Sequence, residues 1–318
     1  SRPGPRDRGR NPQRRAGDPV TSGAGLFDRV EAWRLKGADE EFRGRQIHAC
    51  FQDGEGPLVV LLHGFPTCSY DWRYLFELMP DRALLAFDFL GFGLSDKPRD
   101  HSYTLSWQAD LTEELICRHW AGKPAFICAH DFGASVATEL LARDLADELR
   151  FELAGMLLFN GSILVERSNP TLAQKLLRGP LGPLAARFSN EAFFRRQFAS
   201  VFGGAHPLTD ADATDYWSLM TFNDGNRLGH KLVSYMDERA IYADRWHGAV
   251  SRWKGDLHLA WGMQDPVAVP DILDGLLDMR PDLPVVRMPE LGHYPQVEDP
   301  DRFARILTQS LATSNSSL

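Results

Sequence analysis

Short apolar runs alternate along most of the chain with longer stretches in which apolar residues recur at helical spacing. Asp299-Pro300, an N-cap followed by proline at the first helical position, predicts an amphipathic helix with Phe303 and Leu307 on its apolar face. Apolar runs separated by helices indicate a mostly parallel sheet with both faces covered. Seven strands are predicted, at 46–51, 58–62, 83–87, 125–129, 153–159, 257–261 and 284–288.

The alternation stops between residues 161 and 255, where helical segments rich in aromatic residues replace it. We therefore predict an α/β core formed by residues 26–162 and 251–318, with residues 163–250 inserted as a helical cap. Residues 1–25 contain Pro, Gly and six Arg with almost no apolar residue, which predicts a disordered basic tail. This tail is compatible both with a targeting segment or tether and with a merely solvated end.

The amino-acid composition and the net charge argue against several classes of protein. Of 318 residues, 43% are hydrophobic and 25% are charged, as in ordinary globular domains. The longest purely aliphatic run, Leu58–Leu62, is far shorter than the roughly 20 residues of a bilayer span, so we expect a soluble protein without a membrane span. The net charge of −8 argues against a nucleic-acid partner. Four scattered cysteines without a CxxC pair favour a reducing, cytoplasmic compartment.

The segment 126–135 carries the strongest chemical signal. A predicted strand runs into a predicted helix through one tight turn, and the small residues Ala129 and Gly133 flank Asp131 at its tip. This is the small-x-nucleophile-x-small elbow, in which strand and helix approach so closely that only small flanking residues fit. Taken alone, Asp131 is equally compatible with an ordinary helix N-cap.

An aspartate at this tip would set the type of reaction. A serine needs a base to become nucleophilic, whereas a carboxylate, with an ordinary pKa of about 3.9, is already ionised at neutral pH. Its attack on carbon forms an ester held by the enzyme. Because a carboxylate is a modest nucleophile, the substrate must carry a strained or good leaving group, such as an epoxide oxygen or a halide.

Two further polar residues each follow an apolar strand. Asp265 lies in the sequence Trp-Gly-Met-Gln-Asp-Pro after strand 257–261, and His293 lies in Leu-Gly-His-Tyr-Pro after strand 284–288. Nucleophile, acid and histidine thus follow one another along the chain, each after its own strand, as candidates for an Asp-His-Asp catalytic triad. We predict that Asp131 attacks the substrate and that His293, oriented by Asp265, activates the water that hydrolyses the ester.

With these motifs the sequence resembles the α/β-hydrolase superfamily, in its branch of epoxide hydrolases and haloalkane dehalogenases. The resemblance spans about residues 27–312 and includes His63-Gly64-Phe65-Pro66 and Gly292-His293. It implies an α/β-hydrolase fold whose oxyanion hole is formed by the backbone N–H groups of Phe65 and Phe132. The strings LLHGFPTCSYDW, DFLGFGLSDKP and HYPQVEDP look more particularly like the mesoderm-specific transcript proteins and their bacterial relatives.

The resemblance also separates the candidate substrates. Haloalkane dehalogenases typically hold the departing halide with a Trp after the nucleophile and an Asn or Trp elsewhere, often after the His-Gly pair, but here Phe132 and Phe65 stand there. Epoxide hydrolases instead protonate the epoxide oxygen with cap tyrosines, for which Tyr235 and Tyr242 are candidates, although each is also compatible with a core position. We therefore predict hydrolysis of an apolar epoxide to a diol. Haloalkane dehalogenase, a serine esterase of the same fold and a catalytically silent binding protein are the alternatives.

No cofactor or metal is expected. The glycine-rich loop Asp88–Ser95 lacks both GxGxxG and the Walker lysine, so we interpret it as structural. The expected partners are a small apolar substrate and water. The sequence does not distinguish a cap turn from a pocket wall at Asn223-Asp224-Gly225-Asn226, and it does not fix the oligomeric state.

Overall fold

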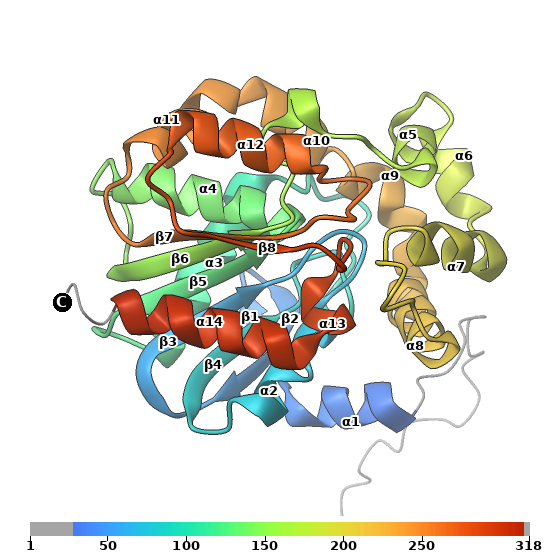
Figure 1. The fold of residues 1–318 in the computed structure, drawn as a ribbon. Helices are drawn as coiled ribbons and strands as arrows, with labels where there is room; N and C mark the ends of the chain where they lie inside the picture. Colours follow the sequence, from blue (N-terminus) through green and yellow to red (C-terminus); the bar gives the residue numbers. More distant parts are fainter. Residues whose placement is uncertain (1–27, 315–318) are drawn as a thin grey trace, which may run out of the picture.

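A single mixed sheet organises the part of the chain that the structure describes (Figure 1). The computed structural model describes residues 28–314, and the predicted basic tail at residues 1–25 lies outside them. The spatial order of its eight strands is β1-β2-β4-β3-β5-β6-β7-β8. The strands span Ala38–Phe42 (β1), Arg45–Gln52 (β2), Glu55–Leu62 (β3), Arg82–Phe87 (β4), Ala125–His130 (β5), Leu153–Phe159 (β6), Leu257–Gly262 (β7) and Val285–Met288 (β8).

The direction of the strands matches the prediction of a mostly parallel sheet. From β4 to β8 all neighbouring strands pair in parallel, and only β1 with β2 and β2 with β4 pair antiparallel. All seven predicted strands are present. Strand β1 was not predicted because its sequence, Ala-Asp-Glu-Glu-Phe, is acidic and buries only Phe42 at the edge of the sheet.

Helices cover both faces of the sheet (Figure 1). One hydrophobic core joins the sheet to α3, α4, α11 and α12, and the other joins it to α1, α2 and α14. Within β3, Leu58, Val60 and Leu62 belong to the first core and Val59 and Leu61 to the second, as the pleat of a strand requires. These helices span Asp28–Lys36 (α1), Leu75–Leu78 (α2), Leu105–His119 (α3), Phe132–Asp144 (α4), Ala243–Arg252 (α11), Pro270–Met279 (α12) and Pro300–Ser314 (α14).

The start of α14 shows how directly a local signal can determine a boundary. The helix begins at Pro300, and the Asp299 carboxylate accepts a hydrogen bond from Arg302 N at 3.0 Å. Asp299 therefore caps the first turn, as predicted. Phe303 and Leu307 are fully buried in the core beneath the sheet.

The segment between β6 and β7 is helical, and most of it gathers beyond one end of the strands (Figure 1). We call α5 to α9 the cap helices. Helix α10 leads from them back toward the sheet, and α11 then packs along α4 on the sheet's face. The additional helices are Leu172–Arg178 (α5), Gly182–Arg187 (α6), Glu191–Ala199 (α7), Asp210–Thr221 (α8), Gly229–Leu232 (α9), Tyr235–Ile241 (α10) and Pro295–Glu298 (α13), with 3₁₀ turns at Ser69–Trp72 (η1), Val165–Arg167 (η2) and Phe222–Leu228 (η3). None of the helices in residues 28–314 is both long enough and apolar enough to span a bilayer.

Candidate active site

The predicted elbow exists and holds Asp131 in a strained conformation. Asp131 stands between β5 and α4 with φ 41° and ψ −102°, in a region that non-glycine residues rarely occupy. The turn is this tight because α4 starts directly against β3. A Cβ atom on Gly133 would lie 2.4 Å from the Leu62 carbonyl oxygen, and Gly133 N donates to the His63 carbonyl at 3.0 Å. Because α4 lies this close to β3, only a residue without a Cβ atom fits at position 133.

The Asp131 carboxylate is not used to cap the helix. Although Asp131 precedes α4, its side chain makes no capping hydrogen bond, which removes the N-cap interpretation. Instead, Oδ2 accepts from Phe65 N at 3.0 Å, and Oδ1 lies 3.4 Å from Arg239 Nη2. The side chain is only 1% exposed. The carboxylate is thus buried at a strained turn, bound to a backbone N–H through one oxygen and facing a cation through the other, and strained residues of this kind cluster at functional sites.

His293 and Asp265 are brought together at the carboxyl ends of β7 and β8. His293 Nδ1 lies 2.6 Å from Asp265 Oδ2, and both side chains are buried. The Asp265 carboxylate is held in turn by Val267 N at 2.7 Å, by Ala268 N at 3.0 Å and by the Asn160 amide at 2.8 Å. These donors fix the carboxylate, which fixes the tautomer and orientation of the imidazole.

The surroundings of His293 determine its protonation. Burial by itself would lower its pKa, but the Asp265 carboxylate bonded to its ring and the Asp131 charge raise the pKa above the ordinary value of 6.5. The neighbouring His130 behaves in the opposite way. Its Nε2 donates to the His293 carbonyl at 2.7 Å, and burial together with the His293 charge lowers the pKa of His130 well below the usual range. His130 therefore remains neutral and supports the backbone of the loop that carries His293.

The structure separates the two predicted cap tyrosines. Tyr235 on α10 is fully buried, and its ring packs 5.9 Å from that of Phe65 and 5.1 Å from that of Phe132. Its hydroxyl accepts a hydrogen bond from Gln174 Nε2 at 3.4 Å. Tyr242, at the start of α11, is 46% exposed and packs on Trp246. Tyr235 thus lies against the residues predicted to supply the oxyanion hole, whereas Tyr242 lies at the surface.

Arg239, which the sequence reasoning missed, is the side chain that α10 places on Asp131. Its guanidinium is buried, donates to the Asp131 carbonyl at 3.0 Å and to Ser135 Oγ at 2.6 Å, and lies 4.4 Å from the centroid of the Tyr235 ring. Tyr235 and Arg239 lie four positions apart in the sequence, which places them on one face of a helix. That spacing was the one available signal, but an arginine in a charged helix normally faces water.

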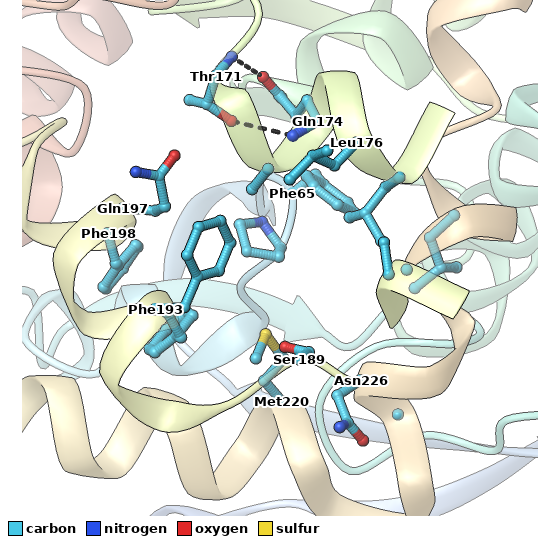
Figure 2. A pocket seen from close by; sticks show the side chains of 18 of the residues that line it. Phe65, Thr171, Gln174, Leu176, Ser189, Phe193, Gln197, Phe198, Met220 and Asn226 are labelled. Carbon is cyan, nitrogen blue, oxygen red and sulfur yellow. Dashed lines mark hydrogen bonds between the residues drawn. The ribbon is translucent and has the colours of Figure 1, made fainter. Parts of the chain in front are cut away.

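An apolar cavity of about 380 Å³ opens between the sheet and the cap helices. Figure 2 shows Phe193, Phe198 and Leu176 among the side chains around it. Phe65 and His293 belong to its wall, and Asp131 lies behind that wall, hydrogen-bonded to Phe65 N. Gly225 and Asn226 of the predicted turn also line the cavity, while Asn223 and Asp224 adopt left-handed backbone angles, so the segment is both a turn and a wall.

The glycine-rich loop after β4 is structural, as predicted. The Asp88 carboxylate accepts from Ser69 N at 2.7 Å and from Leu94 N at 2.6 Å, so it ties the loop to η1. A Cβ on Gly93, whose φ is +47°, would collide with that carboxylate. Within residues 28–314, no group of three or more His, Cys, Asp or Glu side chains is placed to hold a metal ion.

A parallel sheet with a strained elbow after its central strand, and a His–Asp pair at the same edge, defines a hydrolase of the α/β class. The alpha/beta hydrolase family model matches residues 59–306, and the chain belongs to this family. A putative hydrolase of Mycobacterium tuberculosis named LipZ is 48% identical over 251 residues, 79% of this chain and 87% of that protein. The mesoderm-specific transcript protein of Mus musculus is 36% identical over 292 residues, 87% of this chain and 86% of that protein, which confirms the predicted resemblance.

Solved structures agree with the fold. The crystal structure of haloalkane dehalogenase DbeA from Bradyrhizobium elkani superposes with a TM-score of 0.72 and 21% sequence identity, covering 89% of this chain and 99% of that one. At this identity the likeness concerns the arrangement of strands and helices. The chemistry has to be argued from the residues of the site itself.

Proposed function

We propose that this hydrolase opens an apolar epoxide to a diol through a covalent alkyl ester on Asp131. The observation that carries the proposal is the elbow. A carboxylate occupies the strained tip where a hydroxyl would require activation by a base, and its Oδ2 is already bound to Phe65 N at 3.0 Å. The His293–Asp265 pair, joined at 2.6 Å, supplies the group that the second half of the reaction needs.

In the first half-reaction, Asp131 Oδ1 attacks a ring carbon and the carbon–oxygen bond of the epoxide breaks. Tyr235 donates its phenolic proton to the departing oxygen. Burial and the nearby Asp131 carboxylate raise the pKa of Tyr235, so the phenol is protonated at neutral pH and available as an acid. The product of this step is a hydroxyalkyl ester of Asp131 and a Tyr235 phenolate.

In the second half-reaction, His293 takes a proton from water, and the resulting hydroxide attacks Cγ of the Asp131 ester. Negative charge then develops on Oδ2, the oxygen that already accepts from Phe65 N, with Phe132 N as the second donor. Collapse breaks the bond between Cγ and the ester oxygen, and the hydroxyl added to Cγ gives its proton to the departing alkoxide, which releases the diol and restores the carboxylate. The proton on His293 returns to the Tyr235 phenolate. Asp265 stabilises the imidazolium between these steps.

Substrate would reach Asp131 from the apolar cavity beneath the cap. We propose that residues 163–250 act as this cap and that the wall between Phe65 and His293 parts when substrate enters, because Asp131 lies directly behind it. The Arg239 guanidinium, 3.4 Å from Oδ1, moves aside as the substrate carbon takes its place. The free thiols Cys50, Cys68 and Cys128, all buried, are consistent with a proposed cytoplasmic location.

One observation favours haloalkane dehalogenation as the second candidate. Neither Phe65 nor Phe132 has a side chain that can hydrogen-bond a halide, but Arg239 places a buried cation beside the reacting carboxylate. A guanidinium that swings from Oδ1 toward a departing halide would supply the missing stabilisation of negative charge.

The test is to trap the ester. In His293→Gln the first half-reaction should proceed and the second should stall, so intact mass after exposure to apolar epoxides should increase by one substrate, with the adduct mapped to Asp131. Asp131→Asn in the same background is the matched control and should gain no mass. A panel of haloalkanes with halide detection separates the second candidate. An absence of adduct with every epoxide and haloalkane would refute the covalent mechanism and leave a binding protein.

A further inference from the structure

The outer surface of the cap carries a concentration of exposed apolar side chains. Ten large apolar side chains are exposed in the described part of the chain, and five of them fall between residues 172 and 188, on α5, on α6 and at their ends. Single exposed apolar residues are normal in soluble proteins, but a concentration of them on two helices that contact each other is typical of a contact surface. These residues form what we call the α5–α6 apolar face: Leu172 (55% exposed), Leu176 (47%), Leu181 (68%), Leu184 (50%) and Phe188 (69%).

The position of this face relates it to the active site. Figure 1 shows α5 and α6 at the outer edge of the cap, on the side away from the sheet. Leu176 and Phe188 are exposed to solvent and also line the cavity that leads to Phe65 and His293. Figure 2 labels both Leu176 and Phe65 among the side chains that line the cavity. The α5–α6 apolar face therefore borders the cavity through Leu176 and Phe188.

The charge around the face indicates what it contacts. Residues 171–200 contain five basic residues and one acidic residue; Arg178 pairs with Asp237 and Arg195 pairs with Glu191, so Lys175, Arg187 and Arg196 supply the positive charge that remains there. Lys175 on α5 and Arg187 on α6 are exposed and alternate with the exposed leucines. Apolar side chains bordered by lysine and arginine match the surface of a bilayer that contains anionic phospholipids, where the apolar groups enter the acyl boundary and the cations meet phosphate.

We propose that the α5–α6 apolar face docks on anionic phospholipid bilayers, so that an apolar substrate dissolved in the membrane passes directly into the cavity. The part of this inference that concerns the substrate rests on the proposed function, whereas docking itself does not. A cavity lined by Phe188, Phe193 and Leu176 suits a compound that partitions into lipid rather than water. The membrane contact would be peripheral, through side chains of two short helices.

The experiment is vesicle flotation with the full chain. Wild-type protein should float with mixed phosphatidylglycerol–phosphatidylcholine vesicles and bind pure phosphatidylcholine vesicles more weakly. Leu181→Ser combined with Leu184→Ser, at positions that do not line the cavity, should weaken binding by about a hundredfold, at about tenfold for each leucine side chain. Lys175→Glu combined with Arg187→Glu should abolish the preference for phosphatidylglycerol. Leu35→Ser is the matched control, because Leu35 is also 68% exposed but lies on α1, and it should bind as wild type does.

Three results would overturn the proposal. These are no flotation of the wild type, flotation that both double variants retain, or a wild-type dimer that Leu181→Ser with Leu184→Ser converts to a monomer without vesicle binding. The last result would show that a second copy of the chain covers the face. Because flotation requires no turnover, its outcome is independent of the ester trap in His293→Gln. Hydrolysis of a water-soluble substrate should be unchanged in the Leu181→Ser, Leu184→Ser variant.

Discussion

At the scale of single residues, the contact between Arg239 and Asp131 links the proposed nucleophile to helix α10. Both side chains are almost fully buried, at 2% and 1% exposure, so neither charge can be solvated once its partner is removed. We expect Arg239→Met to lower the free energy of unfolding by about 3 kcal/mol, because an uncompensated carboxylate is left in the interior. Urea unfolding monitored by circular dichroism measures this change.

The double variant separates charge from packing. Arg239→Met combined with Asp131→Asn removes both charges and should recover most of the loss in stability, since no unpaired ion remains. If the double variant is as unstable as Arg239→Met alone, the loss comes from the hydrogen bond of Arg239 to Ser135 and from its packing on Tyr235. In that case the ion pair between Arg239 and Asp131 contributes little to the free energy of unfolding.

The raised pKa of His293 has consequences for both stability and turnover. The protonated form is favoured in the folded protein, so its contribution to stability is present below the ordinary pKa of 6.5 and is lost as pH rises through the higher folded value. The free energy of unfolding should therefore fall as pH rises above about 6.5, and fall less in His293→Gln. Equal slopes in both proteins would contradict the raised pKa.

Turnover should change in the opposite sense. Hydrolysis of the ester requires neutral His293, so the rate should increase with pH and reach half its maximum above 6.5. Single-turnover decay of the ester formed in the wild-type protein, followed by rapid quench across a pH series, measures the midpoint. A midpoint below 6.5 would mean that a different group activates the water.

At the scale of elements, the elbow depends on the distance between α4 and β3. Gly133→Ala would place a Cβ 2.4 Å from a backbone oxygen of β3, which cannot move without the sheet. We expect a loss of about 1–3 kcal/mol in the free energy of unfolding, with displacement of Asp131 and loss of ester formation. Gly248→Ala in α11 is the matched control. Its Cβ meets nothing closer than 3.5 Å, so it should raise stability by about 1 kcal/mol.

The cap helix α8 is tied to the core by a second buried contact. Arg73, just after η1, donates to Asp212 at 2.9 Å and to the Tyr216 hydroxyl at 3.3 Å, and it is only about a tenth exposed. Arg73→Met should destabilise the protein by about 2 kcal/mol and increase amide hydrogen exchange across α8, because Asp212 then keeps only the half-exposed Arg29 as its cation and the Tyr216 hydroxyl loses a donor. Hydrogen exchange followed by mass spectrometry localises the effect.

An exposed ion pair between the core and the 3₁₀ turn η3, which follows α8, provides the control for Arg73. The side chains of Arg99 and Asp224 are 64% and 40% exposed, and Arg99 Nη2 lies 3.1 Å from Asp224 Oδ2. Arg99→Met should cost less than about 1 kcal/mol, since water screens such pairs. If Arg73→Met and Arg99→Met had equally small effects, the attachment of α8 would rest on apolar packing instead.

At the scale of the whole molecule, cap and core should unfold as one unit. They share the Arg239–Asp131 and Arg73–Asp212 contacts, and Tyr235 packs against both Phe65 and Phe132. We expect a single transition in urea, with the same midpoint by far-UV circular dichroism and by tryptophan fluorescence. Two separated transitions would show that the cap unfolds independently.

Some residues of the candidate active site could be predicted from the sequence, and others could not. Asp131, Asp265 and His293 could be placed at one edge because each follows an apolar strand, and the carboxyl ends of parallel strands lie together. Tyr235 could not be distinguished from Tyr242, since both lie on short helices whose packing direction the pattern does not specify. Arg239 was missed because nothing in a local pattern indicates that an arginine is buried by a partner 108 residues away.

The sequence by itself determined the seven predicted strands, the elbow at Asp131 and the Asp299 N-cap of α14, because each depends on side chains close together in the chain. The tertiary structure alone decided which tyrosine packs against Phe65, where Arg239 binds and which leucines remain exposed on α5 and α6. Those features depend on how separate helices pack over the sheet. Such packing is a balance of burial and pairing between distant segments, which no short stretch of sequence records.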